Sequence, residues 1–383
     1  MQPGAPAGAA AQQHDVAVYV GRFQPFHDGH LALLRRALAL APRCVVVIGS
    51  AHQAHTPKNP FGWDERAAMI RDALPPDEAR RLLLLPMRDY YDLPRWVVEV
   101  RAGVAALLAG AGLPADARLV LVGHFKDLSS EYLRSFGGWA IESLPRVDVE
   151  DGTQLRDALF GDGAAALADG GVVARQVPPS TSAWLRRWVA SAEYGRLAGE
   201  WRMLNDYHAA WAVAPYPPVL VTVDAVVRCA GRVLLIRRAH APGVGLFAVP
   251  GGFIDQHETA LQSCLRELHE ETHLALSDTE LRACLKGNAV FDHPDRSLRG
   301  RTITHAFFFD LGECALPAVR ADDDAQAVEW LAIDALAGVE DQFHDDHFHI
   351  LDRFLGLLPL PGRGALPGAG AAQVAAHDGG HRR

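Results

Sequence analysis

The stretch Gly251–Leu274, GGFIDQHETALQSCLRELHEETHL, decides the fold of the second half of this 383-residue chain. Four of its apolar residues recur with the spacing i, i+3, i+4 and i+7, which predicts a single apolar stripe along a helix. They are Leu261, Cys264, Leu265 and Leu268. Thr259, with Gln262 three residues later, is a capping-box start. We therefore expect an amphipathic helix that begins close to Thr259.

Three carboxylates gather on one face of this helix. Glu267, Glu270 and Glu271 are spaced i, i+3 and i+4, so their side chains lie close together and repel each other. A divalent cation held by oxygen ligands would offset that repulsion and could take phosphate into its shell. The alternative is a solvated acidic face in which Arg266 pairs with Glu270, the better interpretation for a bare glutamate cluster. The strand and glycine loop that precede the helix favour the metal site and hence metal-assisted attack on a phosphoanhydride.

The spacing of this stretch resembles the Nudix box. From Gly252 it runs glycine, five residues, Glu258, seven residues, and then Arg266-Glu267-Leu268-x-Glu270-Glu271. The resemblance implies that Glu267, Glu270 and Glu271 hold Mg²⁺, with Mn²⁺ as the alternative ion, and that Glu258 and Arg266 brace the loop and helix by charge pairing. The family pattern has a glycine where this chain has His273, at a helix end where a left-handed residue is favoured.

A general base for the hydrolytic half is not singled out by the sequence. The candidates lie in DQFHDDHFHI and just before it; they are Glu340, Asp341, Asp345 and Asp346. The histidines of that segment, His344, His347 and His349, alternate with apolar residues. We interpret this alternation as an amphipathic helix rather than a metal cluster.

The first half of the chain alternates apolar strands with helices. The expected strands are Val16–Val20, Cys44–Ile48, Arg81–Leu85 and Arg118–Val122, and the expected helices are Leu31–Leu40, Trp63–Ala73 and Leu93–Leu108. Continuous apolar strands that alternate with helices are typical of a parallel α/β sheet. Ligands of such a sheet bind at the carboxyl ends of its strands.

The loop after the first strand has the composition of a phosphate site. It reads Gly21-Arg22-Phe23-Gln-Pro-Phe-His27-Asp-Gly29-His30. Glycine permits a tight turn, and a histidine at a helix N-terminus lies where free N–H groups favour anions. For the HxGH pattern alone, a pair of surface histidines is an equally good interpretation.

The loop and two later segments resemble the nucleotidyltransferase superfamily, and more closely the nicotinamide-mononucleotide (NMN) adenylyltransferases of the type fused to Nudix domains. The later segments are Gly123-His-Phe-Lys126-Asp127 and Asp151-Gly152-Thr153-Gln-Leu-Arg156. The resemblance implies that His27, His30 and Arg156 are catalytic. It implies that Gly21, Arg22, Phe23, Lys126, Asp127 and Thr153 bind substrate. Thr181 with Arg186 is a competing candidate for the second phosphate motif, but its spacing is too long.

These resemblances imply two reactions. One joins ATP to NMN, giving NAD and pyrophosphate, and the other hydrolyses ADP-ribose to AMP and ribose 5-phosphate. Two alternatives stay open. The first half could serve another acceptor, such as pantetheine phosphate, and the second half could be a regulator that senses ADP-ribose without hydrolysing it.

Length and composition predict a two-domain cytoplasmic enzyme. The hydrophobic content is 49%, the charged content is 22%, and the net charge of −9 argues against nucleic-acid and membrane partners. Five scattered cysteines without a CxxC pair predict free thiols. We expect a flexible tail over residues 1–14, a Rossmann-like nucleotidyltransferase domain over 15–185, a helical linker over 186–214, an α+β Nudix domain over 215–360 and a disordered tail over 361–383.

Overall fold

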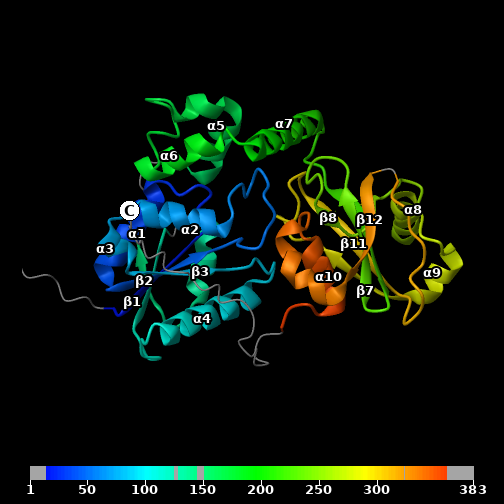
Figure 1. Cartoon of the computed structure of the whole chain (residues 1–383), viewed down its shortest axis with the longest axis horizontal. Helices are drawn as coiled ribbons and strands as arrows, with labels where there is room; N and C mark the ends of the chain where they lie inside the picture. Colours follow the sequence, from blue (N-terminus) through cyan, green and yellow to red (C-terminus); the bar gives the residue numbers. More distant parts are fainter. Residues whose placement is uncertain (1–13, 125–127, 145–150, 323, 360–383) are drawn as a thin grey trace, which may run out of the picture.

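The chain forms two halves, each built around its own β-sheet (Figure 1). The computed structural model describes residues 14–124, 128–144, 151–322 and 324–359. Lys126 and Asp127, expected to bind substrate, lie outside the described residues, as do the two predicted tails except for His14. Within the described part of the chain, no helix is long and apolar enough to cross a membrane.

The N-terminal sheet is parallel throughout and confirms the predicted α/β class. Its strands, in the order β3-β2-β1-β4-β5, are β1 (Val16–Gly21), β2 (Arg43–Ile48), β3 (Leu82–Pro86), β4 (Leu119–Gly123) and β5 (Ala140–Ser143). The first four coincide with predicted apolar runs to within one residue at each end. β5 was not predicted, because most of its side chains are exposed at the sheet edge and it has no apolar run.

Helices cover both faces of this sheet. They are α1 (Asp28–Leu40), α2 (Trp63–Asp72), α3 (Pro76–Ala79), α4 (Leu93–Gly110) and α5 (Gly152–Asp162), with the 3-10 helices η1 (Leu128–Ser135) and η2 (Gly163–Leu167). Alternate residues of each strand point to opposite faces. Ala17 and Tyr19 of β1 therefore pack with α1 and α2, and Val16 and Val18 pack with α4.

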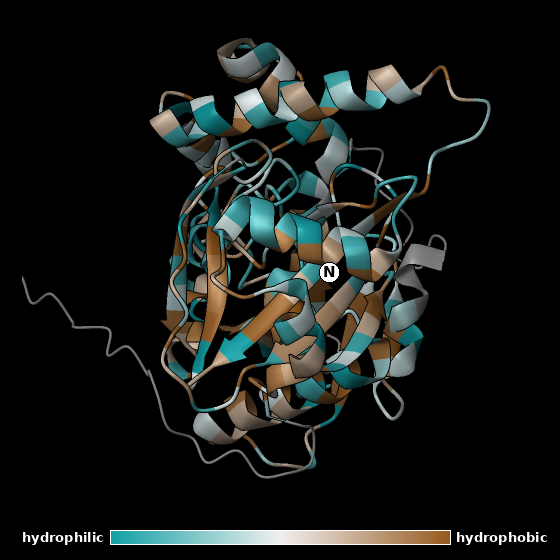
Figure 2. Ribbon diagram, turned by 90° about the vertical axis from the view of Figure 1, so that its right-hand side faces the viewer, coloured by the Kyte–Doolittle hydropathy of each residue, from teal (hydrophilic) through white to brown (hydrophobic). Residues whose placement is uncertain are grey.

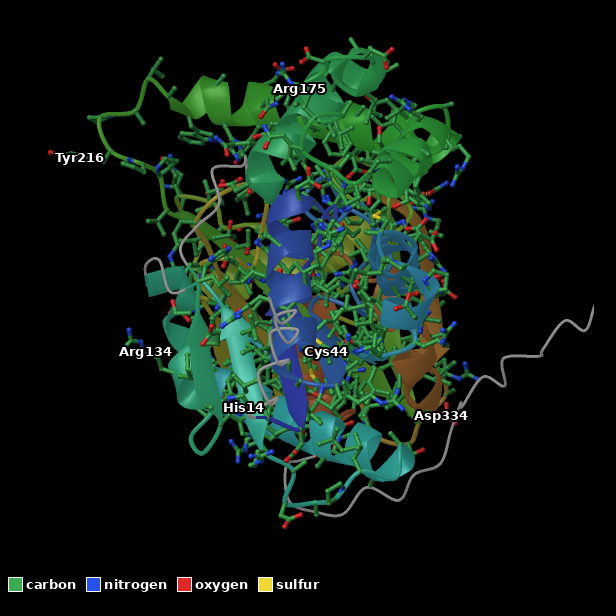
Figure 3. The ribbon with its side chains drawn as sticks, turned by 90° about the vertical axis from the view of Figure 1, so that its left-hand side faces the viewer. His14, Cys44, Arg134, Arg175, Tyr216 and Asp334 are labelled. Atoms are coloured by element: carbon green, nitrogen blue, oxygen red, sulfur yellow. The ribbon has the colours of Figure 1, made fainter. Side chains whose placement is uncertain are left out.

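The predicted helical connector consists of two helices, α6 (Pro179–Trp188) and α7 (Ala192–Trp211). Leu197 and Ala198 of α7 are buried in the same core cluster as α1. Trp201 of α7 also donates its indole N–H to Asp157 of α5 at 3.0 Å. The connector is therefore packed on the N-terminal half. The exposed segment after α7 carries Tyr216, which points into solvent (Figure 3).

The C-terminal half contains a mixed sheet. Its strands are β6 (Leu220–Cys229), β7 (Arg232–Arg238), β8 (Phe247–Ala248), β9 (Gly251–Phe253), β10 (Leu285–Phe291), β11 (Thr302–Asp310) and β12 (Ala325–Ala332). The main order is β10-β11-β6-β7-β12, with β8 paired to β7 and β9 to β6. The β6–β11 pair is parallel and the other pairs are antiparallel. The strands are mainly apolar (Figure 2).

Two helices enclose this sheet from opposite sides. Leu265 and Leu268 of α8 (Ala260–Thr272) belong to one core cluster, and Phe348 and Leu351 of α10 (His347–Leu355) belong to another. The remaining helical elements are α9 (Asp278–Cys284) and the 3-10 helix η3 (Ile333–Gln342). The histidine-rich segment is less helical than its alternation suggested, because α10 begins only at His347.

Ion pairs and hydrogen bonds join the two halves. Arg88, just after β3, forms a bidentate salt bridge with the buried Glu340 of η3. Arg95 of α4 lies 3.4 Å from Asp352 of α10. Figure 1 shows the loops after β2 and β3 extending toward α10, while α7 extends toward the second half from above.

Candidate active sites

The loop between β1 and α1 brings two histidines into direct contact. His27 is the N-cap of α1, and its backbone N–H donates to Nδ1 of His30 at 3.3 Å. The two imidazole rings stack with their centroids 3.6 Å apart, and the ring of Phe23 lies 5.0 Å from that of His30. Burial, together with the nearby His27 and His124, holds the pKa of His30 well below its usual value. His30 is therefore a neutral imidazole at neutral pH.

Thr153 and Arg156 of α5 reach the same loop although they are far away in sequence. Arg156 donates to the carbonyl oxygen of Gln24 at 2.7 Å and to the hydroxyl of Thr153 at 3.1 Å. Burial, with Arg22 nearby, lowers the pKa of Arg156 to about 10, which leaves it a cation at neutral pH. The rival Arg186 instead donates to the carbonyl oxygen of Leu167 at 2.8 Å. The structure thus brings Thr153 and Arg156, rather than Arg186, to the histidine loop.

A cavity of about 520 Å³ opens at the carboxyl ends of β1, β2 and β3. Gly21 and Arg22 of the histidine loop line it, together with Trp96 of α4. Ser50 and Gln53 also line it, and both donate to the Asp89 carboxylate, at 2.6 and 3.0 Å. The sequence analysis did not single out Ser50, Asp89 or Trp96. The Gly49-Ser50 pair at the end of β2 was the available signal.

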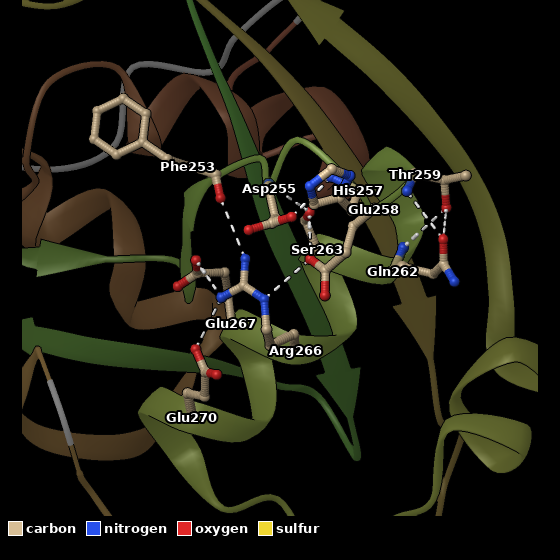
Figure 4. A network of polar contacts seen from close by, with 10 residues as sticks. All are labelled: Phe253, Asp255, His257, Glu258, Thr259, Gln262, Ser263, Arg266, Glu267 and Glu270. Carbon is tan, nitrogen blue, oxygen red and sulfur yellow. Dashed lines mark hydrogen bonds and ion pairs between the residues drawn. The ribbon is translucent and has the colours of Figure 1, made fainter.

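The second site surrounds Arg266 of α8 (Figure 4). Its guanidinium lies 3.0 Å from Glu258, 2.8 Å from Glu267 and 2.9 Å from Glu270. Glu258 also accepts from the hydroxyl of Ser263 at 2.7 Å. The loop before α8 and the helix itself are therefore joined by the charge pair that the sequence analysis expected of Glu258 and Arg266.

Glu271 is the most deeply buried of the three box carboxylates. It accepts a 2.9 Å hydrogen bond from the backbone N–H of Gly251. Burial raises the pKa of Glu271 to about 8, and the neighbouring Glu267 adds to the rise. A side chain at Gly252 would displace the Glu267 carboxylate, because a Cβ there would lie 2.5 Å from it. The glycines thus allow strand β9 to approach the carboxylate helix closely.

Known proteins resemble both halves. A Nudix domain model matches residues 218–354, and a cytidylyltransferase-like model matches residues 18–91. A nicotinamide/nicotinic acid mononucleotide adenylyltransferase of Acinetobacter baylyi is 30% identical over 189 residues, 49% of this chain and 94% of that protein. An ADP-ribose pyrophosphatase of Methanocaldococcus jannaschii is 35% identical over 118 residues, 30% of this chain and 63% of that protein. The chain spans about half the length of several nicotinamide-nucleotide adenylyltransferases that it also matches.

One solved structure matches both halves together. The bifunctional NMN adenylyltransferase/ADP-ribose pyrophosphatase of Francisella tularensis is 31% identical, with a TM-score of 0.81 over 90% of this chain and 99% of that one. It has also been crystallised with AMP and a manganese ion. The chain belongs to this bifunctional family. It is an enzyme with a nucleotidyltransferase half and a Nudix hydrolase half, and Nudix hydrolases need a divalent metal.

The Nudix carboxylates fit a divalent cation in chemistry, although they do not converge on one point. No three histidine, cysteine or acidic side chains in the described ranges are grouped closely enough to hold a metal ion. Glu267 and Glu270 turn toward Arg266, and Glu271 toward Gly251. Burial, with Glu267 nearby, nonetheless raises the pKa of Glu271, and a bound cation would favour its charged form. Binding therefore requires the cation to compete with the Arg266 guanidinium.

Two of the candidate bases in the Nudix half are already engaged. Glu340 pairs with Arg88, and Asp346 accepts two hydrogen bonds from the buried Arg296, at 2.9 and 2.7 Å. Asp345 is half-buried with a raised pKa, caused mainly by desolvation, and its carboxylate lies 3.3 Å from Nε2 of His344. The exposed Asp341 and this more weakly paired Asp345 stay as candidates.

The histidines around η3 and α10 are packed in the interior. His344 is buried and His347 is half-buried, and desolvation holds the pKa of each well below its usual value. The backbone N–H of Val249 donates to Nδ1 of His347 at 3.1 Å. These contacts fit the structural interpretation of this histidine cluster.

His273 ends α8 in the left-handed conformation, with φ 43° and ψ 39°. This is the position where the family pattern has glycine. The side chain compensates by placing Nε2 2.6 Å from the Asp322 carboxylate. The replacement thus keeps the helix end and alters no proposed metal ligand.

Proposed function

We propose that the N-terminal half transfers the adenylyl group of ATP to NMN, giving NAD and pyrophosphate. The observation that carries this proposal is the convergence of Arg156 and Thr153 on the His27–His30 loop at the carboxyl end of β1. Two imidazoles, the buried guanidinium of Arg156 and the N-terminus of α1 meet here and form an environment for a polyphosphate.

Positioning and charge stabilisation account for the chemistry of this half. A phosphate oxygen of NMN attacks the α-phosphorus of ATP in line, and the bond to the bridging oxygen of pyrophosphate breaks. His27 and His30 hold the phosphates, and His30 does so as a neutral imidazole. Arg156 stabilises the negative charge that grows on departing pyrophosphate, and Thr153 binds it. NMN occupies the cavity beside Gly21 and Arg22, and Mg²⁺ arrives with ATP. The ring of Phe23 packs against that of His30 and holds it in place. Lys126 and Asp127 are proposed to bind substrate.

We propose that the Nudix half hydrolyses ADP-ribose to AMP and ribose 5-phosphate. Glu267, Glu270 and Glu271 would hold Mg²⁺, or Mn²⁺, which orients the pyrophosphate and lowers the pKa of an attacking water. Water attacks one phosphorus of the pyrophosphate, the bond from that phosphorus to the bridging oxygen breaks, and the bridging oxygen leaves with the other phosphate. Arg266 keeps two of the carboxylates oriented before the cation binds. AMP, a product of this proposed reaction, is present in a crystal structure of the Francisella relative.

The test is a panel of substrates with product identification. The purified chain is incubated with ATP, Mg²⁺ and each of three acceptors, namely NMN, its nicotinic acid analogue and pantetheine phosphate, and separately with ADP-ribose. We expect NAD and pyrophosphate from NMN, and AMP with ribose 5-phosphate from ADP-ribose. Turnover of pantetheine phosphate instead of NMN would identify another adenylyltransferase. Tight binding of ADP-ribose without cleavage would identify a sensor. We propose that both reactions take place in the cytoplasm, as the sequence analysis expected.

A further inference from the structure

Residues of the Nudix half form one wall of the cavity of the transferase half. One wall comes from the strand ends that carry Gly21, Arg22 and Ser50. The facing wall is formed by the loop between β10 and β11 and by the start of the segment after η3. Its lining residues include His293, Asp295, Arg296 and Asp345. The volume, about 520 Å³, is in the range of pockets for small ligands. The proposed NMN site therefore lies between the two halves.

The loop that forms this wall is anchored at several points. Arg296 is buried and bonded to Asp346 at 2.7 Å. His208 of α7 lies 3.0 Å from the carbonyl oxygen of Leu298 through its Nε2. The ring of Tyr91, from the transferase half, contacts that of His293 edge-on, with centroids 5.0 Å apart. A wall held this way is pre-formed, so it orders little on ligand binding and loses little entropy.

The cavity offers a ligand cations, carboxylates and a histidine donor, and its carboxylates are those of Asp89, Asp92, Asp295 and Asp345. The backbone N–H of Asp295 donates to Nδ1 of His293 at 3.2 Å, so Nε2 is the ring nitrogen that can donate to a ligand. Arg22 and Lys58 add two cations. Lys58 lies 3.4 Å from the Asp295 carboxylate, which neutralises part of its charge before a ligand arrives.

We propose that the Nudix half completes the acceptor site of the transferase half, with His293 donating from Nε2 to an oxygen of the bound mononucleotide. Asp295 tunes the same site, because its carboxylate competes with the ligand for Lys58. The proposal rests on the proposed adenylyl transfer to NMN. It makes the first reaction depend on a loop of the domain that catalyses the second.

The test uses the full chain with single substitutions. His293→Ala removes the donor, and we expect the KM for NMN and the Kd for NMN, measured by calorimetry without ATP, to rise about tenfold, which corresponds to about 1.4 kcal/mol. The KM for ATP and ADP-ribose hydrolysis should not change. His293→Gln, which keeps an N–H donor, should recover most of the affinity. His269→Ala is the matched control, because His269 lies on α8, also pairs with an aspartate and is not among the cavity residues.

Asp295→Asn should lower the KM for NMN, which is opposite to the effect expected of His293→Ala. The Asp295 side chain is 72% exposed, so this variant should fold normally. It frees Lys58, and the KM for NMN should fall by about two- to threefold at low ionic strength, with the difference lost at high salt. An unchanged KM for NMN in folded His293→Ala, or a higher one in Asp295→Asn, would overturn the proposal. A wild-type chain that converts another acceptor but not NMN would instead refute the proposed function.

Discussion

At the scale of single residues, the two sites are chemically independent, so each activity can be removed without the other. His30 belongs to the histidine loop, whereas Glu270 is a half-exposed carboxylate that pairs with Arg266 on α8. His30→Ala should reduce NAD synthesis by at least about a hundredfold, the usual loss for one pre-aimed donor, and spare ADP-ribose cleavage.

Glu270→Gln should abolish ADP-ribose cleavage and spare NAD synthesis, because it removes a charged metal ligand and keeps the helix. Each variant is the control for the other. Equal loss of both activities in either variant would mean that the substitution disturbs the fold.

Glu271 makes the stability of the metal-free protein depend on pH. Because burial raises its pKa to about 8, the folded state keeps a proton that the unfolded state loses. The contribution is favourable below the unfolded pKa and is lost as the pH rises through about 8. A divalent cation replaces that proton, so Mg²⁺ should raise Tm more at about pH 9 than at about pH 6.5. Thermal scans in Mg²⁺ and in chelator measure the difference. In Glu271→Gln, the rise in Tm caused by Mg²⁺ should no longer depend on pH. An equal rise in Tm at both pH values in the wild-type chain would contradict the role of Glu271 as a metal ligand.

At the scale of elements, the end of α8 is stabilised less well than it could be. A non-glycine residue in the left-handed region is disfavoured by about 1 kcal/mol, and His273 adopts that conformation at φ 43°. His273→Gly should therefore stabilise the Nudix half by about 0.5–1 kcal/mol, since the partner Asp322 is exposed and its pairing contributes little. Urea unfolding at equilibrium measures the change. A loss of stability would show that the His273–Asp322 contact outweighs the backbone strain.

The elements that could be predicted are those whose own sequence carries the hydrophobic signal. β1, β2 and β4 are buried on both faces and β3 is half-buried, so their apolar runs define them, and α8 has both a cap and a stripe. β5 was missed because it is an edge strand whose residues are mostly exposed. In the sites, the motifs supplied the histidines and carboxylates. They could not supply Asp89 or His293, because these residues join the cavity only through the way the strands and halves come together.

At the scale of the whole molecule, the two halves have separate hydrophobic cores and meet at an interface with ion pairs. The two clusters of the N-terminal half contain residues up to Ala198, and those of the Nudix half begin at Val223 among their buried members. Between the halves lie the Arg88–Glu340 and Arg95–Asp352 pairs and the cavity. Separate cores favour independent folding, whereas a shared cavity makes one function depend on both halves.

Cutting the chain after Ala214 should separate folding from function. The connector α7 packs on the N-terminal core, so fragment 1–214 keeps it, and fragment 215–383 keeps the complete mixed sheet. We expect both fragments to be soluble and to unfold cooperatively, and fragment 215–383 to cleave ADP-ribose. Fragment 1–214 should still make NAD but with a higher KM for NMN, because the wall that carries His293 is gone, and its KM for ATP should not change. Adding fragment 215–383 at high concentration should lower the KM for NMN again. Calorimetry and steady-state kinetics measure these changes. Failure of either fragment to fold would show that the two halves form one cooperative unit.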